Sequence, residues 1–238
     1  MKYAVCTSFS PSGYESYGKR FIETFKKYWD EEILLYVYYE GEPPSEIDNE
    51  QIFGVNLLED EELSKFLREY DYPAARGITA QGKNYRWQAN KFARKVFAIT
   101  DPNRPPVDYW IWVDADVETF EDIDEEYLAE VCPADCVGSY LGRISWHHSE
   151  CGFVGYNLNE YADDFLQRFR EVYALGEVWS HLEWHDSYIF DRVMEEFPQM
   201  KWHDLSEEQT GMDIWAESIL SERMVHHKGP LAKQEAYT

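Results

Sequence analysis

Basic residues are scarce in this sequence, and their scarcity excludes partners that are held through negative charge. The 238 residues include 22 lysines and arginines against 46 aspartates and glutamates, so the formal net charge at pH 7 is −24. Nucleic acids and anionic membrane surfaces are both bound through clusters of cations. We therefore expect no nucleic acid partner and no anionic membrane partner.

Long apolar runs, linkers and cysteines are also few or absent. No apolar run approaches the roughly 18 residues that a transmembrane helix needs, and strand-like sequence from Lys2 onward leaves no room for a signal peptide. We therefore expect a soluble, cytoplasmic protein with no membrane insertion. No Gly/Ser-rich or Pro-rich linker divides the chain, so residues 1–238 are predicted to form a single domain. The cysteines have neither zinc-finger spacing nor the density of a disulfide scaffold, and we expect reduced thiols at Cys6, Cys132, Cys136 and Cys151.

An unbroken run of five large apolar residues lies near the middle of the chain. This run, 109–113, contains two tryptophans and predicts a central strand that is buried on both faces. Asp114 and Asp116 follow it at once. In an open α/β sheet the ligand crevice lies beyond the carboxyl ends of the strands, so this strand is predicted to bring both carboxylates to a site. Paired carboxylates are suitable ligands for Mg²⁺ or Mn²⁺.

The Asp-x-Asp pattern is a weak signal by itself in so acidic a chain. A second copy occurs at Asp122 and Asp124, directly before Glu125 and Glu126. Carboxylates in the first turn of a helix interact favourably with the positive end of the helix dipole. We therefore interpret the second copy as a helix start and keep the first copy as the candidate site.

The N-terminal third of the sequence has the pattern of a strand, a helix and a strand. The strands are predicted at 3–9 and 33–40, with the helix at 14–29 between them, and this spacing favours a parallel sheet. Thr7 and Ser8 then lie at the carboxyl end of the first strand, where a nucleotide could be met. An equally good interpretation is that they only turn the chain.

The remaining elements follow from hydrophobic periodicity. Helices and strands alternate along most of the chain, which is typical of an α/β fold. We predict helices at 59–70, 85–100, 160–175 and 186–197, and strands at 136–141 and 151–157.

The segment 72–100 contains no aspartate or glutamate, although the chain as a whole has about twice as many acids as bases. A helix over 85–100 would align Arg86 with Arg94, and Lys91 with Lys95. Cations gathered in an otherwise anionic protein favour a local anionic ligand, such as a diphosphate. The alternative is that the cations pair with acids inside the fold. The six cations are Arg76, Lys83, Arg86, Lys91, Arg94 and Lys95.

Two later stretches also combine glycine with chemically active side chains. Glu150 follows a polar loop that contains two histidines. Gly152 lies in the next predicted strand, and a glycine within a strand indicates that another group approaches the backbone closely there. Near the C-terminus, His226, His227 and Lys228 are followed by a glycine and a proline. Imidazole and carboxylate groups are both metal ligands, and lysine can neutralise a phosphate.

Several of these segments together resemble the GT-A class of nucleotide-diphospho-sugar glycosyltransferases, and most closely its small stand-alone enzymes from bacteria and phages. The resemblance covers nearly the whole chain, and the motifs occur in the order found in that family. The segments that carry it are Tyr85-Arg86-Trp87, Lys91 to Ala98, Trp112 to Asp116, Glu150 to Gly155 and Glu183 to Ser187.

The resemblance implies a Rossmann-like α/β fold, with a mostly parallel central sheet flanked by helices. It also implies a metal-dependent transfer of a sugar from a UDP- or GDP-sugar to an acceptor, which the sequence does not identify. The cofactor would be Mn²⁺ or Mg²⁺, held by Asp116 with Asp114 beside it. A C-terminal histidine is often another ligand in that family. This role carries over to His226, with His227 as the alternative.

The other candidate residues follow from the same chemistry. Asp186 is the predicted catalytic base for the acceptor hydroxyl, with Glu150 in reserve, and the alternative for Asp186 is a helix N-cap. The nucleotide sugar is predicted to contact Thr7, Ser8, Arg86, Lys91, Lys95, Asp114, Gly152 and Lys228.

Three other functions are consistent with parts of the sequence. A zinc hydrolase could use His181 and His185 on one helix face, but Glu183 does not follow the first histidine directly as the zincin motif requires. A nucleotidyltransferase would use the same phosphate-binding residues. A non-catalytic carbohydrate-binding module would account for the aromatic residues, although it needs no diphosphate site.

Overall fold

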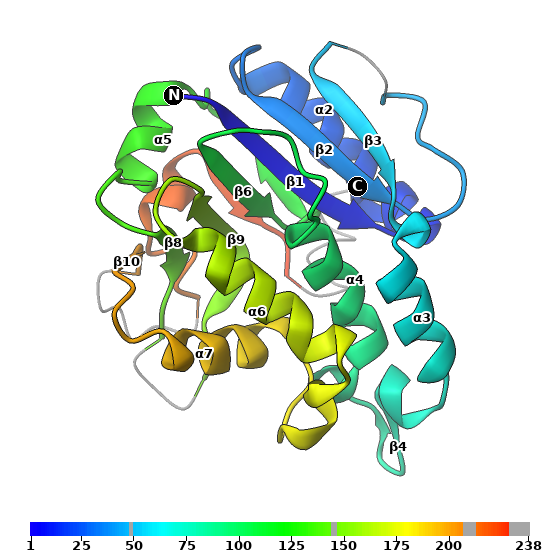
Figure 1. Ribbon diagram of the computed structural model, residues 1–238. Helices are drawn as coiled ribbons and strands as arrows, with labels where there is room; N and C mark the ends of the chain where they lie inside the picture. Colours follow the sequence, from blue (N-terminus) through cyan, green and yellow to red (C-terminus); the bar gives the residue numbers. More distant parts are fainter. Residues whose placement is uncertain (48–49, 144–146, 207–212, 229–238) are drawn as a thin grey trace.

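The computed structural model describes residues 1–47, 50–143, 147–206 and 213–228, and its centre is a seven-stranded sheet (Figure 1). The strands are β1 (Tyr3–Phe9), β2 (Leu34–Tyr39), β3 (Ile52–Asn56), β6 (Tyr109–Val113), β8 (Gly138–Leu141), β9 (Glu150–Asn157) and β10 (Trp202–Asp204). Their order in the sheet is β10-β8-β9-β6-β1-β2-β3. Within this sheet β9 runs antiparallel to its neighbours β6 and β8, and the other pairs are parallel. The predicted mostly parallel α/β sheet is therefore confirmed.

Two small antiparallel pairs accompany the main sheet. β7 (Val117–Thr119) pairs with β11 (Met224–His226), and β4 (Ile78–Thr79) pairs with β5 (Gly82–Lys83). Neither pair was predicted, because strands of two or three residues are too short to show an alternating pattern.

Helices cover both faces of the main sheet. In Figure 1, α3, α4, α6 and α7 lie together in front of it, and α2 lies behind β2. No helix within the described ranges is both long and apolar enough to span a bilayer. The α-helices are α1 (Pro11–Gly13), α2 (Lys19–Tyr28), α3 (Glu61–Glu69), α4 (Ala89–Ile99), α5 (Glu125–Val131), α6 (Ala162–Ala174) and α7 (Asp186–Glu196).

The strand β6 divides the core into two halves. Its side chains alternate, so that Ile111 packs with the residues of α2, while Trp110 and Trp112 pack with those of α3, α4, α6 and α7. All five residues of the strand are buried. The prediction of a central strand buried on both faces is confirmed. Each such side chain contributes about 1.5–3 kcal/mol to the free energy of unfolding.

The first helical segment differs from the prediction of a single helix over 14–29. It begins earlier, at Pro11, because the Ser10 Oγ accepts a hydrogen bond from the Gly13 N–H at 3.2 Å. A π-helical turn over Tyr14–Gly18 then leads into α2. The helix ends before Trp29, whose backbone is extended.

The basic helix predicted over 85–100 is interrupted. Tyr85–Trp87 form a 3₁₀ turn, and α4 begins at Ala89. Between them Gln88 has φ −87° and ψ 56°, which is outside the helical region. The expected alignment of Arg86 with Arg94 along one helix therefore does not exist.

The acidic pair Asp122 and Asp124 lies at a helix start, as predicted. The Asp124 side chain accepts a hydrogen bond from the Tyr127 N–H at 2.8 Å and caps α5. This local role confirms that the second Asp-x-Asp copy is structural.

Candidate active site

A cavity of about 990 Å³ opens where the carboxyl ends of β1 and β6 meet the start of β9 and the start of α7. This volume is in the range of small-molecule sites. Ser8 lines the cavity, whereas Thr7 is fully buried, because successive side chains of a strand point to opposite faces. The other predicted site residues that line it are Arg86, Lys91, Lys95, Asp114, Asp116, Glu150, Gly152 and Asp186.

Asp114 is fixed directly after β6 by hydrogen bonds to Trp112, Lys95 and Gly152, among others. Its Oδ1 accepts from Trp112 Nε1 at 2.7 Å and from Lys95 Nζ at 2.8 Å. Its backbone N–H donates to the carbonyl oxygen of Gly152 at 2.8 Å. The tryptophan of the buried strand therefore orients the first carboxylate of the motif.

The pairing of β7 with β11 brings His226 to the acidic motif. His226 lies opposite Val117 in this pair, and its Nε2 is 3.1 Å from Asp116 Oδ1 and 3.8 Å from Asp114 Oδ2. The neighbouring His227 instead lies with its Nε2 2.9 Å from Glu118 Oε2. Of the two histidines, the structure thus places His226 with the aspartates.

The group Asp114, Asp116 and His226 has the composition of a divalent metal site. One ligand atom from each lies within 4.8 Å of the others. The His226 side chain is 6% exposed and packs against the Trp215 ring at 5.1 Å between ring centroids. Its buried Nδ1 has no hydrogen-bond partner among the described residues. Carboxylates suit Mg²⁺ and Mn²⁺, and imidazole suits transition metals, so these residues fit Mn²⁺ better than Mg²⁺.

Gly152 leaves the room that His226 occupies. A Cβ atom at this position would lie 2.7 Å from His226 Cε1 and 2.8 Å from His226 Nδ1. The group that comes close to the backbone at Gly152, as the sequence predicted, is therefore the imidazole ring of His226.

We expect Gly152→Ala to weaken Mn²⁺ binding by about 10- to 100-fold, the effect typical of disturbing the surroundings of a metal ligand. The added methyl group would push the imidazole, whose movement Trp215 restricts. Calorimetric titration with Mn²⁺ measures the affinity, and a melting curve controls for folding. An unchanged affinity in a folded variant would show that His226 is not a ligand.

Lys95 is buried between two carboxylates. Its Nζ is 2.8 Å from Asp114 Oδ1 and 2.7 Å from Asp186 Oδ2, and it also donates to the Cys151 carbonyl oxygen at 2.7 Å. Burial lowers the pKa of Lys95, but the two carboxylates outweigh burial and raise the pKa above its ordinary value. Burial likewise raises the pKa of Asp186, but Lys95 and His185 bring the pKa below its ordinary value. The pair is therefore charged at neutral pH.

Asp186 opens α7 but does not cap it. The N-cap residue is His185, whose Nδ1 accepts a hydrogen bond from the Tyr188 N–H at 3.4 Å. The N-cap alternative for Asp186 is wrong, because its carboxylate points to Lys95 instead.

The acid-free segment supplies cations to this cavity. All six of its lysines and arginines line it. Some of them also pair with acids: Arg76 with Asp71 at 3.0 Å, Arg86 with Glu183 at 3.1 Å, and Arg94 with Glu40 at 2.8 Å. The two interpretations of this segment are therefore compatible, since several of the cations are paired with acids while all six surround the cavity.

Glu150 and Lys228 form an ion pair beside the metal-type group. Glu150 Oε2 is 3.0 Å from Lys228 Nζ and 3.0 Å from Arg143 Nη2, and Lys228 also lies 3.3 Å from Asp213 Oδ1. Gly229, which follows Lys228, lies outside the described residues.

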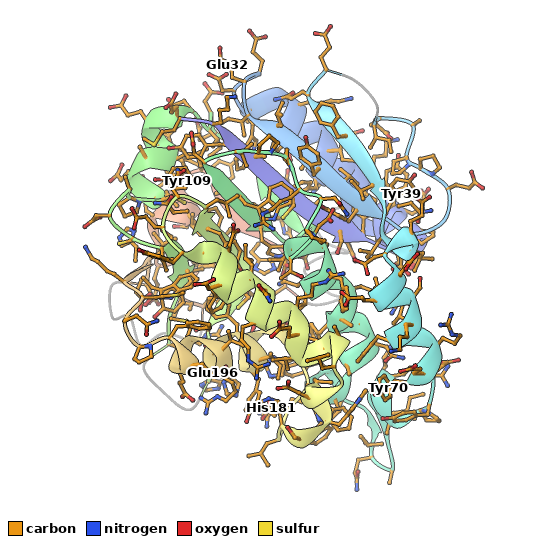
Figure 2. The ribbon with its side chains drawn as sticks, in the orientation of Figure 1. Glu32, Tyr39, Tyr70, Tyr109, His181 and Glu196 are labelled. Atoms are coloured by element: carbon orange, nitrogen blue, oxygen red, sulfur yellow. The ribbon has the colours of Figure 1, made fainter. Side chains whose placement is uncertain are left out.

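A second group of ligand-type side chains, His148, Glu183 and His185, was not predicted as a site. His185 Nε2 lies 2.8 Å from Glu183 Oε2. The helix-face pairing of His181 with His185 does not occur, because residues 181–185 are not helical. Figure 2 shows His181 in the segment that connects α6 to α7, directly after a 3₁₀ turn over Glu177–Ser180. The sequence signals for the second group were the polar loop before Glu150, which contains His148, and the run Glu183-Trp184-His185.

Comparison with known proteins supports the fold. No protein-family model and no curated protein matches the sequence. The crystal structure of a glycosyltransferase involved in the glycosylation of the major capsid of PBCV-1 is similar at 12% identity and a TM-score of 0.53, over 100% of both chains. The crystal structure of mouse xyloside xylosyltransferase 1 in its apo form is similar at 11% identity and a TM-score of 0.54, over 96% of this chain and 98% of that chain. These likenesses confirm the α/β fold with a mostly parallel central sheet that the sequence resemblance implied.

Proposed function

We propose that this protein is a metal-dependent glycosyltransferase that moves a sugar from a UDP- or GDP-sugar to an acceptor hydroxyl. The observation that carries the proposal is the composition of one cavity. Asp114 and Asp116 line this cavity and form a metal-type group with His226 at the carboxyl end of β6, and the cations of the acid-free segment line the same cavity. A diphosphate is bound by a divalent metal together with cationic side chains. Residues suited to both kinds of contact are found at this one cavity.

The residues around the cavity would have different roles in the transfer of the sugar. A divalent ion, when bound, neutralises the negative charge that develops on the departing diphosphate. Arg86 and Lys91 would contact the phosphates, with Lys95 behind them as a buried positive charge. Ser8, at the end of β1, would face the nucleotide.

Asp186 would stabilise positive charge on the sugar rather than remove a proton. Its carboxylate is buried in the cavity wall, and its lowered pKa keeps it anionic at neutral pH. A carboxylate with a lowered pKa is a weak base, but a fixed negative charge in a dry site stabilises developing positive charge strongly. Glu150 remains the alternative carboxylate.

Release of nucleotide tests the proposed function. The protein would be incubated with UDP-sugars and GDP-sugars and with Mn²⁺ or Mg²⁺, and free UDP or GDP would be measured. We expect release of the diphosphate with at least one donor, faster with Mn²⁺ than with Mg²⁺. Release of pyrophosphate from a nucleoside triphosphate and a sugar phosphate would indicate a nucleotidyltransferase instead.

The variant Asp186→Asn is expected to lower kcat by about 10²–10³, the typical effect of removing one stabilising group from a transition state. Donor affinity should change little, because the interaction is made mainly in the transition state. Steady-state kinetics on a preparation with a normal melting curve measures both. Turnover close to that of the wild type would remove Asp186 from the mechanism and favour Glu150.

A further inference from the structure

His148 and Asp191 form a histidine–carboxylate pair in the cavity wall. His148 Nδ1 is 3.0 Å from Asp191 Oδ2. Asp191, on α7, is held in turn by the Ser149 hydroxyl, which donates to its Oδ1 at 2.6 Å. A carboxylate beside Nδ1 favours the imidazole tautomer with its proton on that nitrogen. The lone pair of the neutral ring therefore lies on Nε2.

The Nε2 atom of His148 is placed to meet a molecule in the cavity. His148 lines the cavity, and its side chain is 24% exposed. Nε2 lies 3.9 Å from Glu183 Oε2, which is beyond hydrogen-bond distance. Glu183 is already engaged by Arg86 at 3.1 Å and by His185 Nε2 at 2.8 Å.

The two carboxylates that could act as a base are both held in ion pairs with cations. Asp186 is paired with Lys95, and Glu150 is paired with Arg143 and Lys228. Burial raises the pKa of Asp186, but Lys95 and His185 bring this pKa below its ordinary value and make the carboxylate a weaker proton acceptor. Glu150 Oε2 already contacts both of its cations. An imidazole, in contrast, is a proton acceptor suited to the neutral pH range.

We propose that His148 is the general base that takes the proton of the acceptor hydroxyl, and that Asp191 is its positioning residue. The inference rests on the proposed glycosyl transfer. In the step, the acceptor oxygen forms a bond to the anomeric carbon as its proton passes to His148 Nε2. The bond from the anomeric carbon to the diphosphate oxygen breaks, and the diphosphate keeps the electron pair. The imidazolium is stabilised by Asp191 and later loses its proton to water.

The surroundings of His148 favour this role over a second metal site. The His185 Nδ1 accepts the Tyr188 N–H, so its proton lies on Nε2 and points to Glu183. A protonated Nε2 offers no lone pair to a metal. The charged or titratable groups that face His148 are Asp191, Glu183, His185 and Tyr188, and Arg143 Nη1 donates to its carbonyl oxygen at 3.3 Å.

The test uses hydrolysis of the donor that gives the fastest diphosphate release, with water in place of the acceptor. We expect His148→Gln to lower kcat by about 10²–10⁴ and to abolish the fall of kcat toward acid pH. The affinity for UDP or GDP with Mn²⁺ should stay within about two-fold, because the step lost follows binding. Asp191→Asn should shift the acid side of the pH profile. The control is His181→Gln, which lies outside the cavity lining.

Each outcome separates this inference from the function on which it rests. If the wild-type protein releases no diphosphate from any donor, the proposed glycosyltransferase function is refuted. If the wild-type protein releases diphosphate and His148→Gln keeps the same kcat and pH profile, His148 is not the general base. If His148→Gln does not fold, the pH profile of Asp191→Asn decides, and an unshifted profile overturns the proposal. Tight binding of Zn²⁺ by Asp116→Ala that is lost on adding His148→Gln would also overturn it, in favour of a metal site.

Discussion

Asp116→Ala is expected to abolish both diphosphate release and Mn²⁺-dependent binding of UDP or GDP. Asp116 Oδ1 lies 3.1 Å from His226 Nε2, so the substitution removes the carboxylate around which the ligand group is built. Metal stabilisation of a leaving diphosphate is worth several kcal/mol, and each 1.36 kcal/mol is about ten-fold in rate. The fall in turnover should therefore exceed about 10³-fold.

The nucleotide should lose its affinity together with the metal, because a diphosphate and a carboxylate site each hold the ion incompletely. Calorimetry with UDP or GDP, with and without Mn²⁺, measures this dependence. Asp122→Ala is the matched control, since it lies in the other Asp-x-Asp copy, at the start of α5. Undiminished Mn²⁺-dependent binding by Asp116→Ala would refute the assignment of the metal site.

Lys95→Met is expected to lower the free energy of unfolding by about 3–5 kcal/mol, the cost of leaving buried charge without its partner. Lys95 and Asp186 have side chains that are only 12% and 6% exposed, and Asp114 shares the same cation. Urea unfolding measures the loss. Lys91→Met is the control, because Lys91 is an exposed cation of the same helix.

The loss should depend on pH in a defined direction. Asp186 has a lowered pKa, so its contribution to stability is present above the unfolded-state value of about 3.9 and is lost as pH falls through the folded value. Lys95 has a raised pKa, so its contribution is present below about 10.4 and is lost as pH rises through the folded value. The difference between wild type and variant should thus be largest between about pH 4 and 10.

A second substitution separates the buried charge from lost packing. Adding Asp186→Leu to Lys95→Met replaces the ion pair by apolar groups, which is often nearly neutral. We expect the double variant to recover part of the stability. A double variant that is less stable than Lys95→Met would show that packing rather than unpaired charge causes the loss.

The parts of the fold that could be predicted are those whose signal is local. The run 109–113 and the two aspartates after it are contiguous, so burial of the strand and the place of Asp114 followed from the sequence. The strand β3, in contrast, was not predicted, because Gly54 interrupts its apolar pattern. A Cβ atom at Gly54 would lie 2.1 Å from Ile47 Cδ1, so the glycine makes room for this side chain. That packing partner cannot be recognised from the strand itself.

The parts of the site that could not be predicted depend on contacts between distant segments. The choice of His226 over His227 depends on the register of β11 against β7. The positions of Arg86 and Arg94 depend on the backbone angles of Gln88, which no residue pattern specifies. The pairing of His148 with Asp191 joins a loop to a helix 43 residues away.

The sequence separation of 110 between Asp116 and His226 also sets the order in which a growing chain can complete the site. Ribosomes add about 5–20 residues per second, so the imidazole is made roughly 5–20 s after the aspartate. The central strand and its aspartates can fold in that interval, but the acidic pair has no imidazole until β11 emerges and pairs with β7. A nascent chain is therefore unable to assemble the three-residue group until residues 224–226 have been made, and truncation before residue 224 would leave a chain that keeps all seven strands of the main sheet but not this group.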